Sequence, residues 1–279
     1  MGLRHCLLKD PEIREKYVEQ MRIMIEKGYA EKVPEGEIQT RRRTWYTPHH
    51  GVVNNKKPGK LRVVFDCAAV HQGVSLNQVL MQGPDLNNHL DGVLLRFRKE
   101  SIALVAYVEA MFYQIRVCPR DRNCLRFLWW PNGDLTQKVT PYRMKVHLFG
   151  ATSSPRCVAF SLCQAACDFG GAYEPVVAST VERRMYVDDY LTSVSNVETA
   201  IEQVGGLRSL LAKAGFRLMK WLSNSEEVLA SIPENELTKS LHVHALDCTL
   251  QERILGVVWN VQSDTFRFSV ALPLRPRTR

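Results

Sequence analysis

The spacing of apolar positions near the N-terminus predicts an amphipathic helix. Apolar side chains recur there at the three- and four-residue intervals of one helix face: Ile13, Tyr17, Met21 and Met24. Asp10 is a residue type that caps helices, Pro11 suits a first helical turn, and Gly28 can end the helix. The pattern therefore predicts a helix that begins at Pro11 and ends before Gly28.

Other apolar runs predict strands. The run 102–108 is apolar throughout, which is typical of a strand buried on both faces of a sheet. Segments 50–53 and 61–66 flank a turn-rich stretch and predict a hairpin with a lysine-rich tip. Strands near 254–261 and 265–270 predict a last hairpin.

Two further helices begin at recognisable capping residues. Ser154 followed by Pro155 predicts a helix with Ser154 as its cap. Ser195 and Glu198 have the spacing of a capping box, for a helix that ends at Gly215. Strands and helices mix without regular alternation, so the sequence predicts the α+β class.

The chain of 279 residues is basic, with a formal net charge of +8 and a pI near 9.1. A basic balance fits a polyanionic partner such as nucleic acid, and it fits a merely soluble basic surface equally well. No apolar run approaches the roughly 18 residues of a membrane span. Lys9, Asp10 and Glu12 interrupt any signal-peptide pattern, so we expect an intracellular, cytoplasmic protein without a membrane partner.

The segment Tyr186-Val187-Asp188-Asp189 holds two adjacent carboxylates inside a predicted strand–turn–strand. Such a pair is costly unless a cation neutralises it, and magnesium binds carboxylates together with substrate phosphates. Two such ions activate a 3′-hydroxyl and stabilise the leaving oxygen in phosphoryl transfer. Taken alone, these four residues fit a solvent-exposed turn better, because Asp pairs are common in turns.

Several segments in a fixed order resemble the reverse transcriptase of BEL/Pao-type LTR retrotransposons. They are KPGKLRVVFDC at 57–67, GVSLN at 73–77, QGPDL at 82–86, FLWWP at 127–131, HLFGATSSP at 147–155, AGFRLMKW at 214–221 and LGVVWN at 255–260. The resemblance runs from about residue 7 to 279. It implies a right-hand polymerase fold, an RNA or DNA template–primer, a deoxynucleoside triphosphate substrate and two Mg²⁺ ions.

The resemblance also implies a division of the chain. Residues 1–83 and 118–147 match the fingers, and residues 84–117 and 148–222 match the palm. Residues 223–279 match the end of the palm with the primer-grip hairpin, and we expect the chain to end before most of the thumb.

Individual roles follow from the same resemblance. Asp188 and Asp189 match the catalytic, metal-binding aspartates, and Lys220 matches a lysine that assists proton transfer to the leaving pyrophosphate. The residues that match nucleotide-binding positions are Arg62, Lys60, Lys57, Phe112 and Phe149. The residues that match the primer grip are Leu255, Gly256 and Trp259. A core phenylalanine is the alternative for Phe112, and a solvated surface position is the alternative for each lysine.

One position departs from the family. Close relatives read Asp-Ile-Glu-Ala-Met-Phe where this chain reads Tyr107 to Phe112. Tyr107 therefore occupies the position at which the resemblance implies the third metal-binding aspartate. A neutral phenol with a pKa of about 10 is a poor magnesium ligand. Glu109 lies two residues further along the same strand face, displaced by roughly 6–7 Å. We therefore expect weak magnesium binding and impaired catalysis.

Three hypotheses about function follow. The first is an RNA-directed DNA polymerase domain by descent, with impaired nucleotidyl transfer. The second is a non-catalytic, nucleic-acid-binding remnant of a retrotransposon polyprotein. The third is an unrelated structural protein with chance motifs. Metal-dependent primer extension separates the first from the second, and nucleic-acid binding separates the second from the third.

Overall fold

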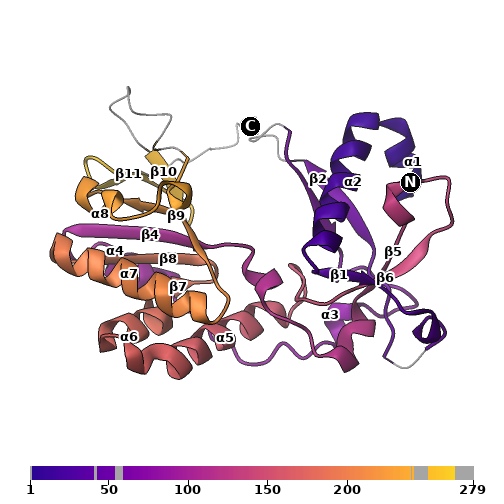
Figure 1. Cartoon of the computed structure of the whole chain (residues 1–279), viewed down its shortest axis with the longest axis horizontal. Helices are drawn as coiled ribbons and strands as arrows, with labels where there is room; N and C mark the ends of the chain where they lie inside the picture. Colours follow the sequence, from indigo (N-terminus) through magenta and orange to yellow (C-terminus); the bar gives the residue numbers. More distant parts are fainter. Residues whose placement is uncertain (1, 41–42, 54–58, 240, 242–250, 268–279) are drawn as a thin grey trace, which may run out of the picture. The chain divides into compact units, whose positions relative to one another are not determined.

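A computed structural model describes most of the chain (Figure 1). The described residues are 2–40, 43–53, 59–239, 241 and 251–267. The chain divides into two compact units. Unit 1 comprises Met1–Asn87 and Ala110–Ser161, and unit 2 comprises Asn88–Glu109 and Leu162–Arg279.

The described residues of unit 1 combine short helices with small antiparallel sheets. The helices are α1 (Leu3–Lys9), α2 (Pro11–Glu26) and α3 (Leu76–Val79), with the 3-10 turns η1 (Glu35–Glu37), η2 (Met111–Gln114), η3 (Pro119–Leu125) and η4 (Pro131–Gly133). The strands are β1 (Ala30–Lys32), β2 (His49–Val53), β3 (Leu61–Phe65), β5 (Arg126–Trp129) and β6 (Thr140–Met144). One sheet has the order β1-β6-β5, and β2 pairs with β3.

The predicted first helix and first hairpin of unit 1 are confirmed. The Asp10 carboxylate accepts a hydrogen bond from the Ile13 amide at 3.0 Å, and Gly28 follows the helix with φ +70°. In the hairpin, Val52 lies opposite Arg62. The predicted lysine-rich tip, with Lys57, lies outside the described residues.

A buried histidine joins α2 to both sheets of unit 1. The Tyr17 hydroxyl lies 2.5 Å from His49 Nδ1, and His49 Nε2 lies 2.9 Å from the Leu128 carbonyl oxygen. With Nε2–H donating to the carbonyl and Nδ1 accepting from Tyr17, the imidazole is neutral. Burial lowers the pKa of His49, and burial also lowers the pKa of His147.

These two histidines predict that unit 1 loses stability in mild acid. A folded-state pKa below the unfolded value of about 6.5 means that the unfolded chain binds more protons below that pH. The stabilisation is therefore complete above about pH 6.5 and is lost as the pH falls, by at most about 1.4 kcal/mol per pH unit for each histidine. Urea unfolding at about pH 7.5 and about pH 5.5 measures the loss.

The matched pair of variants for this prediction is His49→Gln and His50→Gln. His50 is exposed next to the buried His49, so only His49→Gln is expected to weaken the pH dependence. Equal pH dependence in the unmodified chain and in His49→Gln would contradict the assignment.

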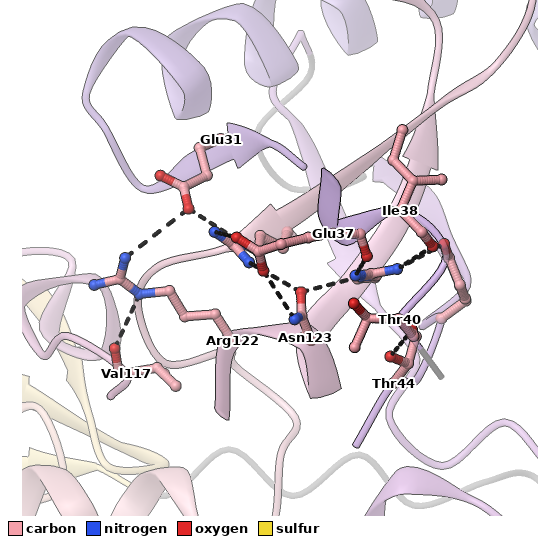
Figure 2. A network of polar contacts seen from close by, with 11 residues as sticks. Glu31, Glu37, Ile38, Thr40, Thr44, Val117, Arg122 and Asn123 are labelled. Carbon is pink, nitrogen blue, oxygen red and sulfur yellow. Dashed lines mark hydrogen bonds and ion pairs between the residues drawn. The ribbon is translucent and has the colours of Figure 1, made fainter. Parts of the chain in front are cut away.

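Buried arginines tie the η1 segment of unit 1 to the β1-β6-β5 sheet (Figure 2). Arg126 has no exposed surface and donates to the backbone oxygens of Glu37 at 2.6 Å and Ile38 at 3.1 Å. Arg143 is also buried and donates to the carboxylates of Glu31 at 2.8 Å and Glu37 at 2.5 Å. Because buried charges are tolerated only when they are hydrogen-bonded, this network fixes the path of residues 31–38.

The central sheet of unit 2 is antiparallel and has the strand order β7-β8-β4-β9. Its strands are β4 (Ile102–Val108), β7 (Met185–Tyr186), β8 (Asp189–Val194) and β9 (Leu218–Ser223), and a second sheet contains β10 (Gln251–Ile254), β11 (Val257–Asn260) and β12 (Thr265–Arg267). The helices are α4 (Leu90–Phe97), α6 (Pro175–Arg184), α7 (Val197–Lys213) and α8 (Glu226–Ala230), with η5 (Gly170–Ala172) and η6 (Glu234–Glu236). Helix α5 (Ser154–Phe169) contributes residues to both units.

Elements cover both faces of the four-stranded sheet. Apolar residues of α4 and of the β10-β11-β12 sheet pack against Ala103, Leu191 and Leu222. On the other face, Gln203 of α7 donates to the Tyr190 hydroxyl at 3.0 Å. In Figure 1, α7 lies along one side of β4, and β10 and β11 lie on the other. The predicted burial of β4 on both faces follows from this layering.

Three predicted boundaries in the second half of the chain are wrong in detail. Helix α7 is capped by Asn196, whose side chain accepts from the Thr199 amide at 2.8 Å, and not by Ser195. Helix α5 already includes Ser154. The predicted strand 254–261 is divided by a turn between β10 and β11.

Within the described ranges, no helix combines the length and apolar character that crossing a membrane requires.

Candidate active site

The β7–β8 hairpin of unit 2 carries the two candidate catalytic carboxylates. Tyr186 pairs with Asp189, which leaves Val187 and Asp188 as a two-residue loop. Val187 has φ +54°, as tight hairpins require at a central position. This conformation is unfavourable for a β-branched residue, and such strain is concentrated at functional sites.

The neighbouring strand β4 places Tyr107 directly beside this hairpin. Tyr107 pairs with Asp189, and the Val108 amide donates to the Asp188 carbonyl oxygen at 2.8 Å. Residues paired across adjacent strands point to the same face of a sheet, so the phenol and the Asp189 carboxylate are neighbours. The predicted position of the aspartate turn, beside the strand with Tyr107, is confirmed.

The Asp189 carboxyl is held in an unfavourable environment for a negative charge. Burial and the adjacent Asp188 carboxylate raise the pKa of Asp189 to about 6, and Lys220 offsets part of this increase. The Lys220 Nζ lies 4.2 Å from the centroid of the Tyr107 ring. A phenol ring and an ammonium group therefore stand next to the carboxylate pair.

These side chains do not fit a two-metal centre. Among the described residues, no group of three His, Cys, Asp or Glu side chains is arranged to hold a metal ion. The position paired with Asp189 supplies a phenol, which is a poor ligand for magnesium. Glu109, two residues after Tyr107 in the chain, makes a long ion pair with Arg217, at 3.9 Å. Within the part of the chain that the structure describes, this hairpin and its neighbouring strand therefore leave Asp188 and Asp189 as the candidate magnesium ligands.

Four predicted nucleotide-binding residues lie on the described part of unit 1. Arg62 on β3 and Lys60 just before it are both exposed. Phe112 is half-buried, and its ring meets the exposed ring of Phe149 edge to face, with the centroids 5.7 Å apart. The structure thus brings the two aromatic candidates together, and Lys57 lies outside the described residues.

Asn77 is a positioning residue that the sequence did not identify. Its side-chain amide donates to the Gly150 carbonyl oxygen at 2.9 Å and accepts from the Thr152 amide at 3.0 Å. These two bonds hold the loop that follows Phe149. Gly150 has φ +99°, a conformation that favours glycine. Asn77 stands in the GVSLN segment, so its only sequence signal was that segment's place in the order of motifs.

The predicted primer-grip residues lie in the β10–β11 hairpin of unit 2. Leu255 and Gly256 form the turn, with φ +47° and +93°. Trp259 has no exposed surface, packs against Phe97 and donates its indole N–H to the Asp264 carboxylate at 2.8 Å. The turn residues are therefore presented by a hairpin that Trp259 anchors in the core.

Solved structures of reverse transcriptases share this fold. The chain resembles a foamy viral protease–reverse transcriptase in complex with double-stranded DNA, at 15% identity over 85% of this chain and 32% of that one, with a TM-score of 0.55. A second structure of that enzyme with double-stranded DNA gives 14% identity, 88% and 39% coverage and a TM-score of 0.55. The native prototype foamy virus enzyme gives 15% identity, 75% and 24% coverage and a TM-score of 0.55.

The chain spans between 24% and 39% of the length of these three proteins. No protein-family model and no curated protein matches the sequence. The mixed helix-and-sheet architecture is that of the reverse transcriptase fold, which confirms the predicted α+β class and right-hand polymerase type.

Proposed function

We propose that this chain is a reverse transcriptase-like domain of the BEL/Pao retrotransposon type that binds a primer–template duplex and is impaired in nucleotidyl transfer. The register that puts Tyr107 opposite Asp189 carries the proposal. This register supports a polymerase-type carboxylate turn in a sheet of the reverse transcriptase fold. It also supports impaired catalysis, because the residue opposite Asp189 carries a phenol where a carboxylate is needed.

In this proposal, unit 1 serves as the fingers and unit 2 as the palm. Arg62 with Lys60 and Lys57 binds the triphosphate of a deoxynucleotide, because a guanidinium fork and ammonium groups suit phosphate oxygens. Phe112 and Phe149 offer an aromatic surface to the sugar and base. Their edge-to-face contact and the exposure of Phe149 support this role.

The remaining roles belong to unit 2. Leu255 and Gly256 at their hairpin turn would contact the primer, with Trp259 as the buried anchor of that turn. Asp188 and Asp189 would hold Mg²⁺ only weakly, because the position paired with Asp189 supplies a phenol in place of a carboxylate. Lys220 stands near the same turn, in the position matched to a proton donor.

The second candidate function is a nucleic-acid-binding remnant without catalysis. The contact between Lys220 and Tyr107 favours it, because that contact brings an ammonium group beside the carboxylate turn. Both candidate functions include duplex binding, and they differ in residual nucleotide addition.

Binding of a fluorescently labelled RNA–DNA primer–template, followed by anisotropy in EDTA, tests the shared part of the proposal. A basic domain of net charge +8 is expected to bind weakly and without sequence preference, through contacts to phosphate. Affinity is expected to fall at least about tenfold between about 50 and about 200 mM salt. No binding at low salt, or equal affinity at both, would count against the proposal.

Two arginine variants sharpen this experiment. Arg62→Ala is expected to weaken the binding of deoxynucleotide to the chain with its duplex, because Arg62 is assigned to the triphosphate. Arg22→Ala serves as the control, because Arg22 is an exposed arginine of α2 that already pairs with Glu19 and Glu26. Equal losses in both variants would mean that only total charge matters, and the role of Arg62 would be abandoned.

A further inference from the structure

Strand β9 contains a β-bulge at the candidate site. On one side of the irregularity Val105 pairs with Leu222, and on the other Tyr107 pairs with Met219. Strand β9 therefore advances three residues where β4 advances two, and one residue of β9 is extra. Lys220 lies inside this interval with φ +55°, a left-handed conformation that is costly for a residue other than glycine.

The bulge determines where the Lys220 side chain points. Bulges re-aim side chains and are frequent next to active sites. Here the Lys220 Nζ is 4.2 Å from the centroid of the half-buried Tyr107 ring, whose own strand partner is Asp189. The face of a tyrosine ring attracts a cation, so the ring holds the ammonium group on the face of the sheet that carries the Asp189 side chain.

We propose that the Lys220 ammonium is a built-in counterion of the Asp188–Asp189 turn, which lets the carboxylate pair persist without a divalent cation. The inference deepens the proposed function and rests on it for the meaning of the turn, whereas the counterion itself rests on the bulge and the ring contact. Tyr107 thus has two effects: it withholds a carboxylate, and it supplies the ring on which the substitute charge lies.

Removal of the ammonium charge leaves two adjacent carboxylates that a cation from solution would then neutralise. The variant Lys220→Met is therefore expected to unfold at a lower temperature than the unmodified chain in EDTA. Millimolar magnesium is expected to reverse that loss. The unmodified chain is expected to show the same unfolding temperature in EDTA and in magnesium.

Thermal unfolding and magnesium titration calorimetry of the full chain test the proposal. Magnesium is expected to bind Lys220→Met on the order of tenfold more tightly than the unmodified chain, because a competing unit charge has gone. Lys220→Arg keeps the charge and is expected to behave as the unmodified chain. Lys213→Met is the matched control: its ammonium lies 4.9 Å from the Tyr173 ring in the same unit, so it loses a cation–ring contact without gaining a magnesium response.

Tyr107→Leu provides a second route to the same result. It removes the ring that holds the ammonium group and leaves both carboxylates, so it too is expected to gain a magnesium response, including when Lys220→Met does not fold. The proposal is overturned when magnesium stabilises the unmodified chain as much as the variants, or when neither variant responds. Duplex binding in EDTA is independent of this result, so its loss would sink the proposed function alone.

Discussion

No nucleotide is expected to be added when the unmodified chain is incubated with a primed RNA template, deoxynucleotides and magnesium. Two-metal transfer requires carboxylates from two neighbouring strands, and the strand position paired with Asp189 is Tyr107. The loss of about 4 kcal/mol or more of transition-state stabilisation lowers the rate by about a thousandfold or more. Single-nucleotide extension of an end-labelled primer, resolved on a gel, measures this rate.

The complementary variant is Tyr107→Asp. It restores a carboxylate beside Asp189 and is expected to strengthen magnesium binding, which calorimetry detects even when extension stays slow. Tyr107→Asn is the control, with the size of aspartate and without its charge, and it is expected to gain only the smaller magnesium response that follows from loss of the ring beside Lys220. Because the Lys220 ammonium would pair with the new carboxylate, the gain is expected to be larger when Tyr107→Asp is combined with Lys220→Met. Robust incorporation by the unmodified chain would show that another group supplies the missing ligand.

The central elements of unit 2 were predictable because burial leaves a strong pattern. The apolar run 102–108 coincides with β4, since a strand covered on both faces excludes polar residues. The Asp188–Asp189 turn was predictable for a related reason, because β-forming residues flank a polar pair. Local boundaries were harder. Ser195 and Asn196 are both good caps, and only the backbone geometry selects Asn196.

The pairing details that give the candidate site its character were not predictable. The contact between Lys220 and Tyr107 depends on one extra residue in the pairing of β9 with β4, and a bulge has no reliable signal in apolar periodicity. The resemblance indicated what Lys220 does in relatives and not which way it points in a chain with Tyr107. The role of Asn77 was missed because a side-chain bond to a distant loop leaves no pattern in the local sequence.

Arg126, at the start of β5, was not predicted to be part of the core, because charged residues are rarely buried. The substitution Arg126→Met is expected to lower the free energy of unfolding of unit 1 by about 3 kcal/mol or more. It removes the arginine donor from the Ile38 carbonyl oxygen and from the Glu37 carbonyl oxygen, which keeps its bond from the Thr40 amide. Methionine fills much of the volume without replacing the lost hydrogen bonds. Urea unfolding followed by tryptophan fluorescence measures the change.

The matched variant is Arg22→Met, which removes an equally well-paired arginine from the exposed face of α2. Little change is expected there, because solvent replaces the lost bonds. Similar losses in the two variants would mean that the buried network adds nothing beyond a surface ion pair, and the account of how residues 31–38 are held would fail.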